Sequence, residues 1–221
     1  MDRSCGAVAR MQAEKVIAGL EKNRMKGYFV SAKKDVPQLV AELLHDGDTV
    51  AVGGSMSLSE CGVMPLLRSG RYRFLDRYAP GLTKEQVRQI FIRSFDADAY
   101  LCSANAVTLN GELYNVDGNS NRVAAICYGP RSVILVVGCN KIVPDIDAAV
   151  RRVKMHAAPP NAVRLSCETY CAKTGVCSGL NGEMPAGCGS DARICCNYVV
   201  SAHQREAGRI KVILVGEPLG Y

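Results

Sequence analysis

Short apolar runs alternate along this chain with longer segments whose apolar residues recur every three or four positions. Runs of the first kind, such as "TVAV" before Gly53 and "SVILVVG" over 132–138, are typical of buried strands. Segments of the second kind, such as 6–26 and 83–95, are typical of helices that bury one face. This alternation predicts an α/β fold in which helices flank a mainly parallel sheet.

Two capping boxes are expected, because a serine or threonine precedes a glutamate or glutamine by three positions at the start of a helical segment. The first pairs Ser57 with Glu60 and is expected to open a helix that runs to Arg68. The second pairs Thr83 with Gln86. In each box, the two side chains satisfy the first free N–H groups of the helix.

A hairpin is predicted at Asn110-Gly111, which separates the expected strands 98–108 and 111–116. This dipeptide is a preferred two-residue hairpin turn. No internal repeat is visible, so we expect one domain over residues 1–221. Within this domain, a cysteine-rich insertion at about 166–196 lacks the periodic apolar pattern of the helices and strands.

Composition excludes several classes of protein. The 221 residues are 48% hydrophobic and carry a net charge of +6. Basic residues are scattered rather than grouped with aromatic ones, which argues against nucleic acid as a partner. No apolar run reaches the roughly 18 residues of a membrane span, and residues 1–27 do not resemble a signal peptide. We therefore expect a cytoplasmic protein with no membrane or nucleic-acid partner, and a weak bias toward small anions.

The first candidate site is "GGSMS", a strand-to-helix junction. Such junctions lie at the carboxyl edge of a parallel sheet, where free backbone N–H groups bind phosphate or carboxylate. Glycine lets a ligand approach the backbone closely. A tight turn with a capping serine explains the same residues, and neither the Walker nor the dinucleotide motif is present. The candidate substrate-binding residues here are Gly53, Gly54, Ser55, Met56 and Ser57.

The second candidate site is the amide-rich stretch 103–125. A turn at Asp117-Gly118 explains part of it, and an EF-hand is excluded because Arg122 takes the place of the required glycine. A guanidinium flanked by amides is suited to a two-pronged contact with a substrate carboxylate. The candidate substrate-binding residues are Asn105, Asn115, Asn119, Asn121 and Arg122, and the candidate proton-transfer residues are Glu60, Asp117 and Lys141.

Eleven cysteines are the unusual feature of the composition, and six of them lie in 166–196. Without a secretory signal, a disulfide framework is not the first expectation. The spacing lacks the paired C-x-x-C of zinc ribbons and the C-x-x-C-x-x-C of bacterial ferredoxins. Four thiolates from a loop with few large apolar residues still suit an iron–sulfur cluster or a tetrahedral zinc ion. The candidate ligands are Cys171, Cys177, Cys188 and Cys195.

Other interpretations of the cysteines stay open. The loop cysteines can form a disulfide or remain as inert thiols, and Cys167 and Cys196 are neighbours that can substitute as ligands. Four of the cysteines outside the loop are expected to be buried thiols because their neighbours are apolar. These are Cys61, Cys102, Cys127 and Cys139.

Several segments together resemble the LUD domain, the lactate-utilisation protein family. They are "GGSMSLSECGV", the stretch from Ala104 to Leu165, and the cysteine-rich C-terminal part. The resemblance implies a fold related to ribose-5-phosphate isomerase, glucosamine-6-phosphate deaminase and CoA-transferases. It also implies that the loop matching "GGSMS" contacts phosphate or carboxylate.

The cysteine loop resembles the C-terminal motif of the single-domain branch of that family, and its four candidate ligands match the four cysteines of the motif. Two departures stand out: Tyr170 replaces a proline, and about eight extra residues, 179–186, precede Cys188. The ferredoxin pattern of a sister subunit is missing, so electron transfer by that route is not implied.

The sequence therefore predicts an enzyme that acts on a small hydroxy or oxo acid or a sugar acid beside an iron–sulfur cluster of the 4Fe-4S type, with zinc as the alternative. Its partner is a small anionic substrate, and it forms a homodimer or joins subunits of a lactate-oxidation complex. The rival hypothesis is a non-catalytic accessory subunit of a lactate-oxidising complex with a structural metal site. A sensor whose cluster reports oxidation is a third hypothesis.

Overall fold

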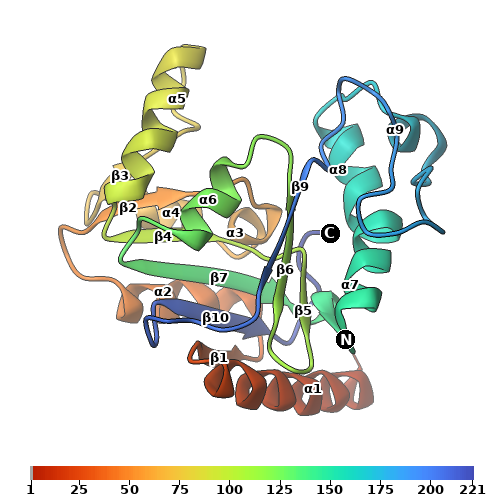
Figure 1. Ribbon diagram of the computed structural model, residues 1–221. Helices are drawn as coiled ribbons and strands as arrows, with labels where there is room; N and C mark the ends of the chain where they lie inside the picture. The colour runs from red at the N-terminus through yellow and green to blue at the C-terminus, as the bar shows by residue number, and fades with distance from the viewer. Residues whose placement is uncertain (1) are drawn as a thin grey trace.

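The computed structural model describes residues 2–221, and its main element is a six-stranded sheet whose neighbouring strands all run parallel (Figure 1). The strand order is β1 (Lys26–Val30), β10 (Ile210–Val215), β7 (Ser132–Gly138), β4 (Ala99–Cys102), β2 (Thr49–Val52) and β3 (Arg73–Leu75). The predicted α/β fold with a mainly parallel sheet is confirmed.

Helices cover both faces of this sheet, and the central strand β7 shows why. Successive side chains of a strand point to opposite faces, so Val133 and Leu135 pack in one core cluster and Ile134 and Val136 in another. The helices of the first cluster are α1 (Arg3–Lys22) and α6 (Asn121–Cys127), and those of the second are α2 (Val36–Leu43), α3 (Met56–Glu60) and α4 (Val63–Leu67).

A second, smaller sheet stands beside the first (Figure 1). Its strand order is β8 (Ile142–Val143), β5 (Ala106–Thr108), β6 (Leu113–Asp117) and β9 (Asn197–Ser201). The predicted hairpin is confirmed, because β5 and β6 pair antiparallel. Its expected two-residue turn is wrong, because Thr108 donates its N–H to the carbonyl of Glu112 and three residues, 109–111, form the loop. One long helical segment packs on this sheet and leads to the cysteine loop. It comprises α7 (Ile146–Arg152), the π-helical Val153–Ala157 and α8 (Ala158–Arg164), and α9 (Tyr170–Thr174) follows.

The single strand expected over 98–108 is wrong, because the chain passes from the first sheet to the second within it. The break falls at Ser103 to Asn105, whose carbonyl groups bond to side chains instead of to a neighbouring strand. Arg122 donates to the carbonyl of Ser103 at 3.0 Å, and Arg152 to that of Asn105 at 2.7 Å. Two arginines thus end one strand and re-aim the chain toward the next.

The single helix expected after "GGSMS" is also wrong. It is divided into α3 and α4 by Gly62, which adopts a left-handed conformation with φ 72°. The N-cap is Ser55 rather than Ser57, and Glu60 accepts the N–H of Gly220 at 2.9 Å instead of closing a capping box. The hydroxyl of Ser57 is therefore available for another contact.

The Thr83–Gln86 capping box is confirmed. It opens α5 (Lys84–Arg93), which projects from the molecule and has no buried residue (Figure 1). In residues 2–221, short 3-10 helices are also present at Lys33–Asp35, Ser94–Asp96 and Cys139–Lys141. Among residues 2–221, no helix has the length and apolar character needed to cross a membrane.

We expect Gly19→Ala to lower the free energy of unfolding by about 1–3 kcal/mol. Gly19 of α1 lies against the hairpin turn, and a Cβ there would stand 2.4 Å from the carbonyl carbon of Asn110. The matched control is Gly6→Ala in the same helix, where a Cβ meets nothing within 4 Å. That change is expected to raise the stability by roughly 0.5–1 kcal/mol. Urea denaturation measures both, and equal effects would contradict this packing.

Candidate functional site

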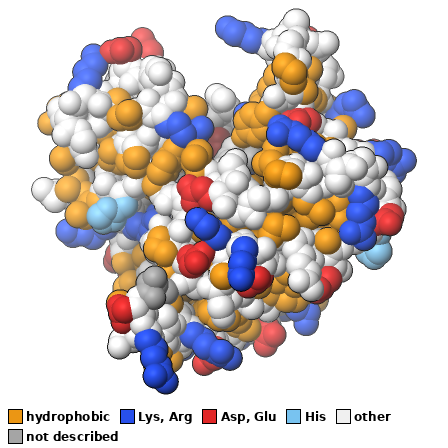
Figure 2. Space-filling model, turned by 180° about the vertical axis from the view of Figure 1, so that it is seen from behind, with side chains coloured by type: hydrophobic (Ala, Val, Ile, Leu, Met, Phe, Trp, Pro, Cys, Tyr) orange, Lys and Arg blue, Asp and Glu red, His pale blue; other side chains and the backbone are white. Residues whose placement is uncertain are grey.

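A polar pocket of about 590 Å³ lies where β2, β4 and β6 end. Figure 2 shows the molecule hollowed between the projecting α5 and the lobe that carries the cysteine loop. Nine sequence-predicted residues line this pocket: Gly54, Ser55, Met56, Asn105, Asp117, Asn119, Asn121, Arg122 and Lys141. The two candidate sites of the sequence therefore form one pocket.

Four predicted residues do not line it. Gly53 packs closely on its neighbours, since a Cβ there would stand 2.9 Å from the Tyr100 hydroxyl and 3.0 Å from Arg122 Cγ. Asn115 is fully buried beneath Arg122. The two others are Ser57, which is fully buried, and Glu60, which holds the C-terminal segment. These residues support the pocket from behind rather than facing a ligand.

Arg122 is bonded within the protein through every branch of its guanidinium. Its acceptors are the carbonyl of Ser103 (3.0 Å), Asn115 Oδ1 (2.6 Å), Asn105 Oδ1 (3.0 Å), the carbonyl of Val116 (2.8 Å) and Asp117 Oδ2 (3.3 Å). Of its five N–H donors, the four on Nη1 and Nη2 are hydrogen-bonded to the first four of these acceptors, and Nε forms an ion pair with Asp117. The predicted two-pronged contact from Arg122 to a substrate carboxylate therefore has no free donor here. Arg122 instead fixes the amides and Asp117 in the pocket wall.

Lys141 is buried at the bottom of the pocket. Its Nζ donates to Ser57 Oγ and to Ser103 Oγ, both at 3.1 Å. Burial lowers the pKa of Lys141 to about 7, and the charges of Arg152 and Arg122 act in the same direction. Within residues 2–221, no carboxylate forms an ion pair with it. Sequence reasoning missed Ser103. Its position could have indicated a pocket residue, because it follows directly after a buried strand, at the carboxyl edge of the sheet.

The pKa of Lys141 gives the folded protein a specific pH dependence. Because that pKa is about 7 in the folded chain and 10.5 for an exposed lysine, the unfolded chain binds more protons between these values. The contribution of Lys141 to stability therefore rises with pH in this window. We expect the free energy of unfolding of the wild type, minus that of Lys141→Met, to increase from pH 7 to pH 10 in urea denaturation. A difference that is flat with pH would contradict the burial of a lysine with this pKa.

Two further arginines at the pocket were missed by sequence reasoning because they are far from the candidate motifs. Arg77 stacks on Phe91 with its guanidinium carbon 4.5 Å from the ring centre, and it reaches within 4.0 Å of a Cβ placed on Gly54. Arg164, at the end of α8, also lines the pocket. Within residues 2–221, neither arginine forms an ion pair. Their charges are therefore available to an anion.

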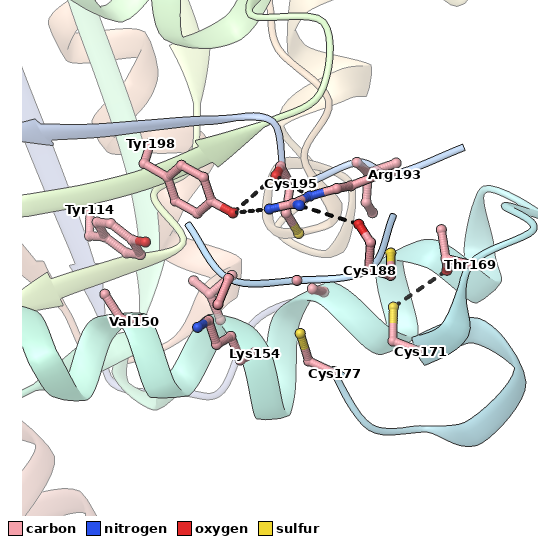
Figure 3. Close-up of a pocket in the computed structure, with 15 residues that line it drawn as sticks. Tyr114, Val150, Lys154, Thr169, Cys171, Cys177, Cys188, Arg193, Cys195 and Tyr198 are labelled. Carbon is pink, nitrogen blue, oxygen red and sulfur yellow. Dashed lines mark hydrogen bonds between the residues drawn. The ribbon is translucent and has the colours of Figure 1, made fainter. Parts of the chain in front are cut away.

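The four predicted cysteine ligands all line a second, smaller cavity of about 30 Å³ (Figure 3). This volume is about that of one water molecule in the liquid. The residues are Cys171, Cys177, Cys188 and Cys195. Among residues 2–221, no group of three or more His, Cys, Asp or Glu side chains is arranged to hold a metal ion. The structure thus brings the four thiols to one cavity without a ready-made site for a single ion.

Two cationic side chains hold the cysteine loop in place. Arg193 donates to the carbonyls of Cys195 (2.8 Å) and Cys188 (3.2 Å). Lys154 donates to three carbonyls of the lengthened segment: Gly179 (2.7 Å), Gly182 (3.0 Å) and Glu183 (2.6 Å). The extra residues 179–186 are therefore fastened to the main domain. Burial raises the pKa of Cys195 to about 12, and the charges of Cys177 and Cys171 add to this rise.

The remaining cysteines divide into buried and accessible ones. Cys61 and Cys102 are buried as predicted, and burial raises the pKa of each thiol to about 12. Cys139 is partly buried. The prediction for Cys127 is wrong, because its side chain is exposed at the end of α6. The apolar residues beside it in the sequence face the sheet, while its own position on the helix faces outward.

The polar pocket and the cysteine cavity share a wall. Arg193 and Ile194 line both of them. The same segment is bonded to the polar site, since Cys196 donates its N–H to the carbonyl of Asp117 at 3.2 Å. The polar pocket and the cysteine cavity are therefore adjacent and joined by one segment of chain.

Fold and site together define a class: an α/β protein whose parallel sheet carries a polar, arginine-lined pocket beside a cavity lined by four cysteines. Residues 13–215 match the LUD domain, and the chain belongs to the LUD domain family. Membership supports a protein related to lactate utilisation.

One solved structure agrees with this fold over nearly its whole length. A DUF162 family protein from Deinococcus radiodurans is similar with a TM-score of 0.51 at 19% identity, over 95% of this chain and 98% of that one. A second similarity is to eIF2B beta from Chaetomium thermophilum, with a TM-score of 0.36 at 19% identity over 52% of this chain and 43% of that one. A search of curated proteins found no match.

Proposed function

We propose that this protein is an enzyme that acts on a small hydroxy or oxo acid, or a sugar acid, bound in the polar pocket beside an iron–sulfur cluster. The observation that carries the proposal is the shared wall: Arg193 and Ile194 line both the polar pocket and the cavity of the four cysteines. A substrate bound in the pocket is therefore next to any group that the cysteines hold.

The charge of the pocket supports an anionic substrate. Five cationic residues line it, Arg77, Arg122, Lys141, Arg164 and Arg193, against Asp117 and Asp191. Arg122 is paired with Asp117, and Arg193 is bonded within the cysteine loop. The unpaired Arg77 and Arg164 are therefore the residues that we assign to the substrate carboxylate. Asn119 and Asn121 at the pocket wall supply amide donors and acceptors for hydroxyl or oxo groups.

Lys141 is the proton-transfer group of this proposal. General acid–base catalysis is most efficient when the pKa of the group is near the working pH, and the pKa of Lys141 is about 7. Glu60 is bonded to Gly220 away from the pocket, and Asp117 is paired with Arg122. Of the three predicted proton-transfer residues, Lys141 is thus the one that lines the pocket and forms no ion pair within residues 2–221.

The donor set of the second cavity supports a metal group, because four thiols are the ligands that iron–sulfur clusters and zinc take. Cys171, Cys177, Cys188 and Cys195 would hold it. A 4Fe-4S cluster supplies either an electron path or, when one iron has an open position, a Lewis acid. Four cysteine ligands leave no iron open, so the second role requires that one cysteine is not a ligand.

The test begins with protein purified without oxygen. We expect a broad visible absorbance, with iron and sulfide in matching amounts. Calorimetric titration with lactate, pyruvate and glycerate then measures binding, and turnover is followed for each acid that binds. We expect Arg77→Met and Arg164→Met each to weaken binding about tenfold, as the loss of one charged contact of about 1.5 kcal/mol predicts. The matched control is Arg131→Met, an exposed arginine that does not line the pocket.

The outcomes separate the hypotheses. Absence of binding by every acid, with a cluster present, would overturn the substrate assignment. Colourless protein that contains one zinc ion and binds no acid would instead support the accessory subunit of a lactate-oxidising complex. Binding of an acid without turnover would favour the sensor.

A further inference from the structure

Three polar groups converge behind the polar pocket, from segments that are far apart in the sequence. Lys141 Nζ lies 3.1 Å from Ser57 Oγ and 3.1 Å from Ser103 Oγ, and the two hydroxyl oxygens are 3.4 Å apart. A serine within hydrogen-bond reach of a base, with the base held by a third group, is the arrangement of an activated nucleophile. Lysine serves as the base in the Ser–Lys variants of the catalytic triad.

The burial of these groups argues for function rather than packing. Lys141 is 4% exposed and its partners are two hydroxyl groups, whereas the similarly buried Lys154 is held by three carbonyl oxygens. A neutral amine avoids the cost of burying a charge, and the neutral form is the one that accepts a proton. The site therefore holds the lysine in the state that a general base needs, near neutral pH.

Only one of the two serines can meet a ligand. Ser103 lines the polar pocket together with Lys141, whereas Ser57 is 0% exposed and does not line it. Ser103 is thus the nucleophile candidate, and Ser57 positions the amine. Gly54 and Ser55 line the same pocket, and within residues 2–221 no backbone carbonyl accepts from their N–H groups. Such donors are suited to the oxyanion that forms in acyl transfer.

We propose that Ser103, with Lys141 as general base and Ser57 as positioning residue, forms a covalent acyl-enzyme with an ester or thioester of a small acid. As Ser103 Oγ bonds to the acyl carbon, its proton passes to Lys141 Nζ. The bond from the acyl carbon to the alcohol or thiol breaks, and Lys141 returns the proton to that leaving group. Water then attacks the acyl carbon, its proton passes through Lys141 to Ser103 Oγ, and the free acid leaves. The sum is hydrolysis, without oxidation or reduction.

This inference rests on the proposed function only for the anionic end of the acyl group, which Arg77 and Arg164 would bind. The covalent step needs no metal group. Its test is therefore independent of the cluster, and the two proposals can fail separately.

The test uses p-nitrophenyl acetate with the full chain. We expect a burst of one p-nitrophenolate per chain, one acetyl group added to the intact mass, and the acetylated peptide to contain Ser103. Ser103→Ala is expected to abolish the burst because it removes the nucleophile. Lys141→Met is expected to reduce the burst rate by at least about 100-fold, the lower bound for loss of general acid–base catalysis. Ser59→Ala, an exposed serine of α3, is the control and is expected to change nothing.

The role of Ser57 has its own measurement. The burst rate of the wild type is expected to rise with pH through about 7, following the deprotonation of Lys141. Ser57→Ala is expected to shift this midpoint while it leaves acetylation at Ser103, which a merely structural serine would not do. Ser103→Cys keeps a nucleophile at the same place and guards against loss of folding, so we expect its thiol to be acetylated. Acetylation at another residue, or an unchanged burst in Ser103→Ala, would overturn the proposal, as would absence of any burst.

Discussion

Replacing Arg122 with methionine is expected to lower the free energy of unfolding by about 3–5 kcal/mol, as removal of one partner of a buried ion pair does. Arg122 and Asp117 have side chains that are each 10% exposed. Without the guanidinium, Asp117 becomes a buried charge with no cation, and Asn115 Oδ1 loses its donor. The carbonyls of Ser103 and Val116 lose theirs as well. Each of these groups loses a donor or cation in a poorly hydrated site, and Asp117 retains the N–H of Ser120 at 3.0 Å.

Urea denaturation with far-ultraviolet circular dichroism measures this loss. The matched control is Arg164→Met, whose arginine is exposed at the pocket rim and is expected to change stability by less than about 0.5 kcal/mol. Combining Arg122→Met with Asp117→Asn removes the unpaired charge and is expected to recover part of the loss. A cost below about 1 kcal/mol for Arg122→Met would show that these hydrogen bonds do not hold the pocket wall in solution.

Strands β2, β7 and β10 of the parallel sheet could be predicted because each is a mainly apolar run that reaches a glycine at its end. In β7, no polar residue follows Ser132, so apolar side chains point to both faces of the sheet, which indicates burial on both faces. The cap at Thr83 was equally visible, since both partners of its capping box lie within one turn of the chain. Local signals of this kind need no knowledge of the rest of the fold.

The places where prediction failed depend on distant residues. Ser55 and Ser57 are both suitable N-cap residues. Ser57 instead accepts a hydrogen bond from Lys141, which lies 84 positions further along the chain. Residues 98–108 have the pattern of a single strand. They form two strands because Arg122 and Arg152 bond to the carbonyl groups of Ser103 and Asn105 between them. Nine of the predicted residues therefore line the pocket, but their roles could not be predicted, because the roles follow from tertiary contacts.

Arg122 illustrates this difference most clearly. An arginine among asparagines suits a ligand carboxylate and a structural network equally well, because both offer oxygen acceptors to the same donors. The structure assigns those donors to the protein, and it leaves Arg77 and Arg164, which no motif marked, at the pocket. A pocket built in this way presents to its ligand a wall fixed by Arg122 and two arginines that form no ion pair within residues 2–221.

Cys188→Ser is expected to lower the metal content of the protein by more than tenfold, because it removes a proposed direct ligand. Even the outer partners of metal ligands change affinity by roughly 10–100-fold, so the loss of a direct thiolate ligand is expected to exceed that. We expect iron and sulfide per chain, or zinc if that is the bound metal, to fall below a tenth of the wild-type value. The visible absorbance of an iron–sulfur cluster would fall in proportion.

Cys167→Ser is the matched control, because Cys167 belongs to the same loop but does not line the cavity of the four cysteines. It is expected to keep the metal. Full metal retention by Cys188→Ser would exclude this residue as a required ligand and leave three thiolates, the number that frees one iron of a cubane for a substrate. Equal loss in both variants would instead mean that the loop's fold, rather than the cavity, governs metal binding. The cavity assignment thus depends on the difference between two cysteines of one loop.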